Sequence, residues 1–199
     1  MASATSPKKA IVFVAQGSEE METVIVVDVL RRAGIQVLVL AVEISSGSVT
    51  CSRGVRLVPD AYLGDDSVKI SAFDAVVVPG GAGGSEILSQ NAQVRCILSD
   101  FHAQHKIVAA ICAGSLAIKT AGIQSHLSEP LRITSHPSVR DQLVDDFSYK
   151  EERVVVDGNL VTSRGPGTAL EFALRLVSLL SGPDKAREVA APMVLNFSL

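Results

Sequence analysis

The sequence predicts an α/β protein in which helices surround one mostly parallel sheet. Short apolar runs rich in β-branched residues alternate with longer mixed segments, which is the pattern of βαβ units. The runs are apolar throughout instead of alternating, as is typical of strands buried on both faces of a parallel sheet. With 199 residues, the chain has the length of one domain. We expect a short disordered lead over 1–8, a single domain over 9–195 and a tail over 196–199.

Apolar runs and turn residues place the individual elements. The expected buried strands cover 10–15, 36–42, 73–78 and 106–111, with hairpins at 49–59 and 154–162 and a short strand or loop at 133–134. Asp157-Gly158 in the second hairpin is typical of a two-residue turn. Ser18 and Thr168 are the expected N-caps of helices that end near Gly34 and at 180. The other expected helices cover about 91–104, 113–122 and 183–191.

Composition and charge exclude several classes of function. The formal net charge is −3 and no basic patch stands out, which argues against a nucleic-acid partner. Every apolar run is too short to span a membrane, and the first residues lack the apolar segment of a signal peptide. Cys51, Cys96 and Cys112 form neither a metal-binding spacing nor an even disulfide set. We therefore expect a cytoplasmic protein whose thiols are reduced.

Cys112 has the most informative position in the chain. It directly follows the apolar strand 106–111 and precedes the small residues Ala113-Gly114. A strand that turns sharply into a helix presents the turn residue at the carboxyl edge of the sheet, as in a nucleophile elbow. Unpaired N–H groups at the start of a helix favour a thiolate. A buried, inert cysteine fits the same pattern, and the residues alone do not decide between the two.

Other candidates follow neighbouring strands at the same sheet edge. A helix with Met21, Val24 and Ile25 turned inward would bring Glu22 near Cys112, where a buried carboxyl has a raised pKa and can relay a proton. The backbone N–H groups of Gly80-Gly81 could approach a bound oxygen, although turn formation explains these glycines equally well. No dinucleotide fingerprint or P-loop is present, so we expect no nucleotide cofactor.

The histidines offer one candidate acid–base partner for the thiol. His136 precedes Pro137 at a strand end, although a His-Pro pair also marks an ordinary turn. His102 and His105 are three residues apart on an expected surface helix without nearby acids, which is weak evidence for a metal. We expect no metal site.

Six motifs occur together in order along the chain. They are Gly17-Ser18-Glu19-Glu20-Met21-Glu22, Cys51-Ser52-Arg53, Pro79-Gly80-Gly81, Ala110-Ile111-Cys112-Ala113-Gly114, Ser135-His136-Pro137 and Thr162-Ser163-Arg164-Gly165-Pro166-Gly167-Thr168. Their combination closely resembles the parkinsonism-associated deglycase branch of the ThiJ/PfpI superfamily, from about Lys9 to Leu195. The resemblance favours the reactive interpretation of Cys112 over the inert one.

The resemblance implies a flavodoxin-like three-layer sandwich that forms a homodimer and needs no metal or organic cofactor. It implies that Cys112 is both nucleophile and oxidation site, with protonated Glu22 hydrogen-bonded to it and His136 nearby. Gly80, Gly81 and Ala113 would bind a substrate oxyanion or an oxidised sulfur through backbone N–H groups. Arg53 would reach across the dimer toward the partner's site, in a region supported by Arg164 and Pro166.

The implied activity is cofactor-independent chemistry on reactive aldehydes. It is either glutathione-independent glyoxalase activity of the D-lactate dehydratase type, converting methylglyoxal or glyoxal to hydroxy acids, or deglycation of early glycation adducts. The alternative is a non-enzymatic redox sensor and chaperone that signals through oxidation of Cys112. The family resemblance is also compatible with a nuclear or mitochondrial location.

Several positions depart from the resembled pattern. Ala113 replaces the histidine of protease-like superfamily members, which disfavours peptide hydrolysis. Val58 stands where vertebrate-type members have a peripheral cysteine, and Ser115 replaces a frequent proline after the elbow. The apolar finish over 196–199 replaces a charged one.

Overall fold

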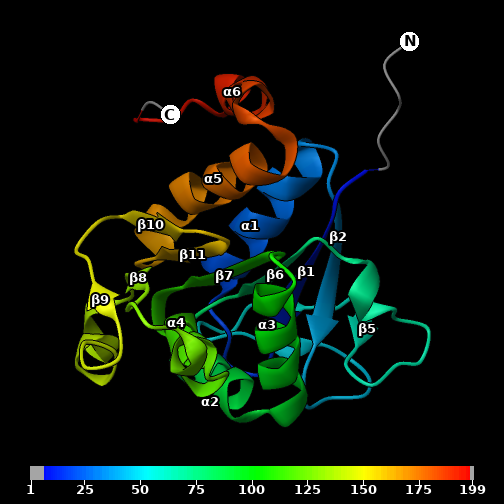
Figure 1. The fold of residues 1–199 in the computed structure, drawn as a ribbon. Coiled ribbons are helices and arrows are strands. Elements are labelled where there is room, and N and C mark those ends of the chain that lie inside the picture. The colour runs from blue at the N-terminus through cyan, green and yellow to red at the C-terminus, as the bar shows by residue number, and fades with distance from the viewer. Residues whose placement is uncertain (1–6, 198–199) are drawn as a thin grey trace.

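The computed structural model describes residues 7–197, in which seven strands form one central sheet. The expectations for the lead and the tail concern mostly residues 1–6 and 198–199, which lie outside the described residues. The sheet order is β10-β11-β7-β6-β1-β2-β5 (Figure 1). Its strands are β1 Lys9–Val14, β2 Gln36–Ala41, β5 Ala61–Tyr62, β6 Ala75–Val78, β7 Ile107–Ile111, β10 Val154–Asp157 and β11 Leu160–Ser163. All pairings are parallel except that of β10 with β11, so the predicted mostly parallel sheet is confirmed.

The central strands are buried because helices cover both faces of the sheet. β1 lies between β2 and β6, with Val12 paired to Val39 on one side and to Val77 on the other. Residues 10–15 and 75–78 are at most 1% exposed. The continuous apolar runs are therefore buried on both faces of the sheet, which explains why these runs predicted the strands correctly.

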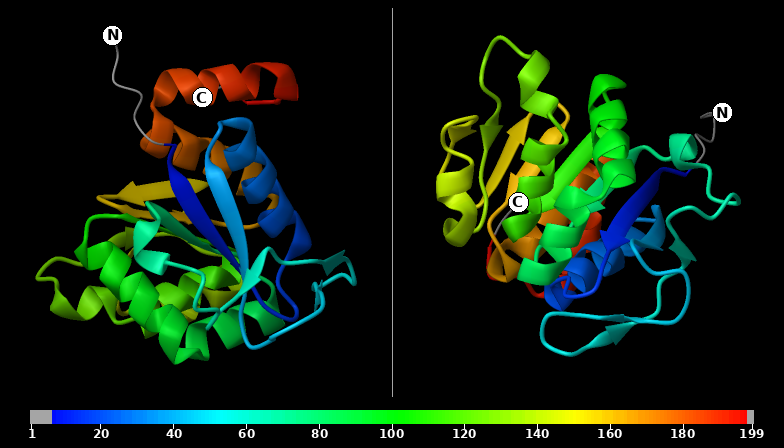
Figure 2. Two further views of the ribbon diagram at one scale, coloured as in Figure 1. Left: turned by 90° about the vertical axis from the view of Figure 1, so that its right-hand side faces the viewer. Right: turned by 90° about the horizontal axis from the view of Figure 1, so that it is seen from below.

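Six α-helices in the described residues form the two outer layers (Figures 1 and 2). One layer contains α1 Glu20–Arg32, α5 Ala169–Ser181 and α6 Pro183–Ala190, with α5 packed against both of the others. The opposite layer contains α2 Ala82–Gln90, α3 Ala92–Ala103 and α4 Ser115–Thr120. The result is the expected three-layer sandwich. No helix among residues 7–197 is long and apolar enough to cross a membrane.

Two small two-stranded sheets among the described residues accompany the central sheet. The first predicted hairpin is present as antiparallel β3 Val49–Thr50 and β4 Arg56–Leu57. The strand or loop expected at 133–134 is β8 Arg132–Ile133, which pairs in parallel with β9 Ser148–Tyr149. The sequence did not predict the short edge strand β5.

The predicted helix caps are wrong in detail. Glu19, not Ser18, caps α1, because its carboxylate accepts the backbone N–H of Glu22 at 2.7 Å. The Ser18 hydroxyl instead accepts the N–H of Ala15 at 3.0 Å and closes the turn after β1. Thr168 precedes α5 without capping it, since its hydroxyl accepts the N–H of Gly165 at 3.0 Å. Both side chains stabilise the preceding turn instead of the helix.

Two further differences concern turn residues. Asp157 pairs with Leu160, so the two-residue turn consists of Gly158 and Asn159 instead of Asp157 and Gly158. Helix α2 was not predicted, because its first residues Ala82-Gly83-Gly84 have a composition typical of a loop. Gly84 lies against Ser18, and a Cβ atom at Gly84 would come within 2.5 Å of the Ser18 Cα. This close approach explains glycine in a helical position.

Gly114 brings the turn after β7 against the end of β6. A Cβ atom on Gly114 would lie 2.6 Å from the carbonyl oxygens of both Val78 and Pro79. Backbone atoms cannot move aside as a flexible side chain can. Glycine at 114 therefore permits the close packing that holds Cys112 next to the β6 end.

We predict that Gly114→Ala lowers the free energy of unfolding by about 1–3 kcal/mol, the usual cost of overpacking. Gly167→Ala is the matched control, since a Cβ there meets no atom within 4 Å. Urea denaturation of both variants measures the difference. Equal stability of Gly114→Ala and the wild type would contradict this account of the turn.

Candidate active site

Cys112 lies at the carboxyl end of β7, where the chain turns into the 3-10 turn Cys112–Gly114 and then into α4. Its φ is +64°, in the left-handed region that residues other than glycine seldom adopt. Backbone strain of this kind is typical of the nucleophile elbow. The residue is 9% exposed, so the thiol is largely buried.

Glu22 is the acidic neighbour of this thiol. It is fully buried, and one carboxyl oxygen, Oε2, accepts the backbone N–H of Gly80 at 2.7 Å. The other oxygen, Oε1, is buried without a hydrogen-bond partner among the described residues. The Cys112 side chain is within hydrogen-bonding reach of the carboxyl group. Burial raises the pKa of Glu22 to about 7, although the hydrogen bonds from Gly80 and Cys112 oppose this shift.

The position of Glu22 agrees with the expectation, but the reasoning that led to it is wrong. Met21 and Val24, expected to face inward, are 52% and 46% exposed. The buried face of α1 contains Glu22, Val26, Val29 and Leu30, which are spaced at helical intervals. The helix is thus rotated relative to the prediction, and an apolar stripe faces outward.

Burial and charge act on Cys112 in the direction opposite to the sequence-based expectation. Burial, followed by the negative charge of an ionised Glu22, raises the pKa of Cys112 to about 12. Hydrogen bonds from the backbone N–H groups of Ala113 and Gly81 to the sulfur lower it. The repulsive contribution exists only while Glu22 is ionised, so the two groups titrate as a pair.

Gly80 supports Glu22 and does not present a free donor to substrate, contrary to the expectation. Its N–H is already bonded to Glu22. A Cβ atom on Gly80 would lie 2.6 Å from Cys112 Cβ, 2.9 Å from Cys112 Sγ and 2.8 Å from Glu22 Oε2. Glycine at position 80 therefore permits the thiol and the carboxyl to meet. The backbone N–H groups of Gly81 and Ala113 lie within hydrogen-bonding reach of the Cys112 sulfur, and their binding of a substrate oxyanion stays a prediction.

A cleft of about 720 Å³ opens in front of Cys112. Six of the expected site residues line it, namely Arg53, Gly81, Cys112, Ala113, His136 and Pro166. Cys51, Ser52 and Ser138 are also part of the lining. Arg53 thus lines the cleft of its own chain. Arg164 lies outside the lining and forms an ion pair with Glu151, Nη1 to Oε2, at 2.6 Å.

Glu20 holds the loop that carries Arg53, a role that the sequence did not reveal. Its carboxylate accepts the Ser52 hydroxyl at 2.8 Å and the Arg53 N–H at 2.8 Å. Burial opposes ionisation, but the hydrogen bonds outweigh it and lower the pKa of Glu20. The only signal in the sequence was the carboxylate itself. A carboxylate at this position is also explained by its favourable interaction with the first turn of α1.

The backbone of His136 lies beside the backbone of Cys112. Its N–H donates to the Cys112 carbonyl oxygen at 3.3 Å. Its ring Nδ1 is 2.8 Å from the Ser138 hydroxyl oxygen and accepts the Ser138 backbone N–H at 3.2 Å. The ring is therefore held at the rim of the cleft.

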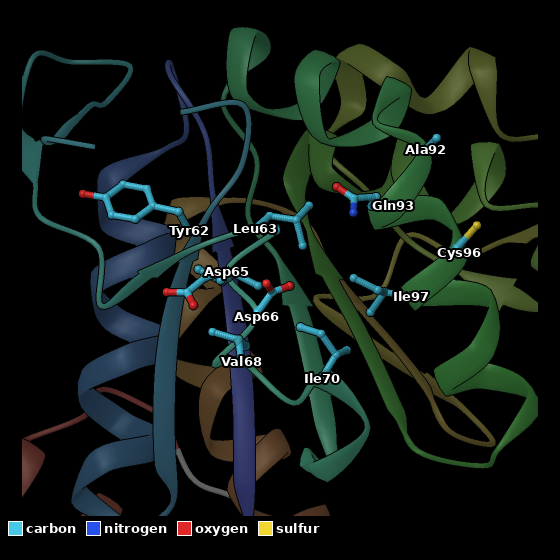
Figure 3. A pocket seen from close by; sticks show the side chains of 12 residues that line it. Tyr62, Leu63, Asp65, Asp66, Val68, Ile70, Ala92, Gln93, Cys96 and Ile97 are labelled. Carbon is cyan, nitrogen blue, oxygen red and sulfur yellow. The ribbon is translucent and has the colours of Figure 1, made fainter. Parts of the chain in front are cut away.

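A second cavity lies apart from this cleft. It measures about 540 Å³ and extends between the segment after β5 and helix α3 (Figure 3). Cys96 and the two carboxylates of Asp65 and Asp66 are among its lining residues, and it shares none with the Cys112 cleft. Within residues 7–197, no group of three or more His, Cys, Asp or Glu side chains could hold a metal ion.

Comparison with known proteins identifies relatives that span nearly the whole chain. Residues 8–179 match the model of the DJ-1/PfpI family. The Parkinson disease protein 7 homolog of Danio rerio is 44% identical over 191 residues, covering 95% of this chain and 98% of that protein. The glutathione-independent glyoxalase DJR-1.2 of Caenorhabditis elegans is 36% identical over 181 residues, covering 90% and 92%.

Solved structures agree with these relatives. The crystal structure of Drosophila melanogaster DJ-1beta superposes with a TM-score of 0.88 at 41% identity and covers 96% of this chain and 100% of that one. The structure of oxidized Toxoplasma gondii DJ-1 has a TM-score of 0.82 at 35% identity, with coverage of 96% and 100%. The chain is therefore a member of the DJ-1/PfpI family.

Proposed function

We propose that the protein is a cofactor-independent cysteine enzyme that converts methylglyoxal or glyoxal to hydroxy acids without glutathione. Cys112 is the nucleophile and Glu22 is the acid and base. The observation that carries this proposal is the buried Glu22 carboxyl against the Cys112 thiol, with Oε1 buried without a hydrogen-bond partner among the described residues. A relative named as a glutathione-independent glyoxalase supports the same activity.

The proposal assigns the proton shared by this pair to Glu22. A buried carboxylate oxygen without a donor is costly, whereas a carboxylic acid can donate its O–H to sulfur. Burial raises the pKa of the Cys112 thiol most; with the proton on Glu22, the negative charge that adds to this effect is absent. The N–H groups of Gly81 and Ala113 then stabilise the sulfur anion.

The reaction begins with attack of the Cys112 thiolate on the aldehyde carbon. A C–S bond forms, the carbonyl oxygen takes the Glu22 proton, and a hemithioacetal results. The Glu22 carboxylate then removes the proton from this carbon and returns it to the adjacent carbon through an enediol, while the hydroxyl proton passes from the first oxygen to the oxygen on the adjacent carbon. The product is a thioester, which water hydrolyses to a hydroxy acid and free Cys112. The substrate is oxidised at one carbon and reduced at its neighbour, so no external oxidant is required.

Early glycation adducts fit the same mechanism as a second class of substrate. In these adducts the former aldehyde carbon is next to a carbonyl carbon, as in methylglyoxal. A protein amine or thiol bonded to the former aldehyde carbon is the leaving group. The cleft of about 720 Å³ is larger than methylglyoxal needs, which favours this extension to deglycase activity. Removal of such aldehydes would protect a cell under oxidative stress.

We predict that Cys112→Ser lowers methylglyoxal turnover at least about 10³-fold, since no comparable nucleophile replaces the sulfur. Cys96→Ser is the matched control, because Cys96 is exposed and lines the other cavity. Turnover is measured as glutathione-free production of lactate by the purified protein. Full activity of Cys112→Ser would refute the proposed mechanism.

A redox sensor and redox-dependent chaperone is the second candidate function, and the two N–H donors at the sulfur favour it. A thiolate displaces hydroxide from one peroxide to give sulfenic acid, and a second peroxide yields sulfinate and water. The donors of Gly81 and Ala113 would stabilise the sulfinate oxygens.

Mild peroxide treatment followed by mass spectrometry tests this second candidate. We expect Cys112 to gain two oxygen atoms before Cys51 or Cys96 is modified, because the N–H groups of Gly81 and Ala113 stabilise its thiolate and the sulfinate formed from it. Simultaneous oxidation of all three cysteines would rule out a dedicated sensor thiol.

We also propose that the protein works in the cytoplasm as a homodimer built from a single domain over 9–195. The outward apolar stripe of α1 lies next to the hairpin of β3 and β4. Met21 and Val24 of α1 and the residues that flank β4, Val55 and Val58, are exposed on this surface, and Val58 is 79% exposed. An apolar surface of this kind is typical of a protein interface.

Sedimentation analysis checks the dimer. We expect the wild type at twice the mass of one chain and Val58→Asp shifted toward one chain, since burying an unpaired charge is costly. Val194→Asp is the control, because Val194 is 93% exposed outside this stripe. A monomeric wild type would refute the assignment.

A further inference from the structure

Ser138 determines which nitrogen of the neutral His136 ring carries the proton. The Ser138 backbone N–H points at His136 Nδ1 at 3.2 Å, and an N–H group can only donate. Nδ1 must therefore present its lone pair, and the Ser138 hydroxyl at 2.8 Å can donate to the same atom. In the neutral ring the proton then resides on Nε2.

His136 lines the cleft together with Cys112 and Pro166. Its Cδ2 atom, next to Nε2, is the atom nearest to the Cβ position of Gly165, at 3.5 Å. No described residue forms a hydrogen bond with Nε2, so this N–H is available to a molecule in the cleft.

We propose that His136 acts in the cleft as a hydrogen-bond donor through Nε2–H and does not act as a base. Ser138 is the positioning residue that holds the ring in this tautomer. This inference rests on the proposed aldehyde chemistry. Within that chemistry it assigns proton transfer to Glu22 and hydrogen-bond donation to His136. It replaces the sequence-based interpretation of His136 as an acid–base partner of the thiol.

The donor would act on the oxygen that becomes negative during the reaction. When the carbon-bound proton of the hemithioacetal leaves, it goes to the Glu22 carboxylate, and negative charge develops on the neighbouring carbonyl oxygen. Nε2–H stabilises that charge by a hydrogen bond, with no proton leaving the ring. Glu22 is then the only side chain that accepts a proton during the reaction.

Amide substitutions separate a donor from a base. In His136→Gln the side-chain amide can reach the position of Nε2 and donate, but an amide is not a base at neutral pH. In His136→Asn the amide reaches only the position of Nδ1, where it preserves the cap on the Ser138 N–H. His136→Asn is therefore the matched control for folding, and His136→Ala removes both functions.

We expect His136→Gln to retain methylglyoxal kcat within about tenfold of the wild type, and His136→Asn and His136→Ala to lose about 10²-fold. Equal, large losses in all three variants would overturn the donor role. Nitrogen-15 NMR of the wild-type imidazole gives a readout that needs no turnover. A neutral ring protonated on Nε2 supports the inference even if Cys112→Ser refutes the proposed reaction, and a ring protonated on Nδ1 overturns it.

Discussion

One proton shared between two buried groups determines what this site can do. Glu22 is fully buried beside Cys112, and burial raises the pKa of its carboxyl to about 7. Each group disfavours ionisation of the other, so the pair carries one negative charge more readily than two. Where that charge resides decides whether the sulfur is a nucleophile. The backbone N–H groups of Gly81 and Ala113 favour the charge on sulfur, while Gly80 and the Cys112 thiol favour it on the carboxylate.

The fold places these groups at the carboxyl edge of three neighbouring parallel strands. The segment after β1 supplies the carboxyl, the segment after β6 supplies the N–H groups of Gly80 and Gly81, and the segment after β7 supplies the thiol and the N–H group of Ala113. Ligands of open α/β sheets usually bind at this edge. Glycine is required at Gly80 and Gly114, where added Cβ atoms would meet the site or the backbone behind it. Close packing therefore maintains the contact between Glu22 and Cys112.

Much of the fold could be predicted because the buried strands are continuous apolar runs, and the position of Cys112 followed from the strand before it. The orientation of α1 could not, since apolar residues occur on both its buried and its outward face. The roles of Gly80 and Glu20 depend on hydrogen bonds to residues 58 and 33 positions away, which no local pattern encodes. The shift of the thiol pKa could not be predicted either, because Cys112 becomes buried only when the helical layers and the sheet pack together.

The pH dependence of thiolate absorbance, taken as the difference between the wild type and Cys112→Ser, tests the central claim most directly. If Glu22 holds the proton, the thiolate signal persists well below the ordinary thiol pKa of about 8.5. A signal that appears only above this value would place the proton on sulfur and contradict the account.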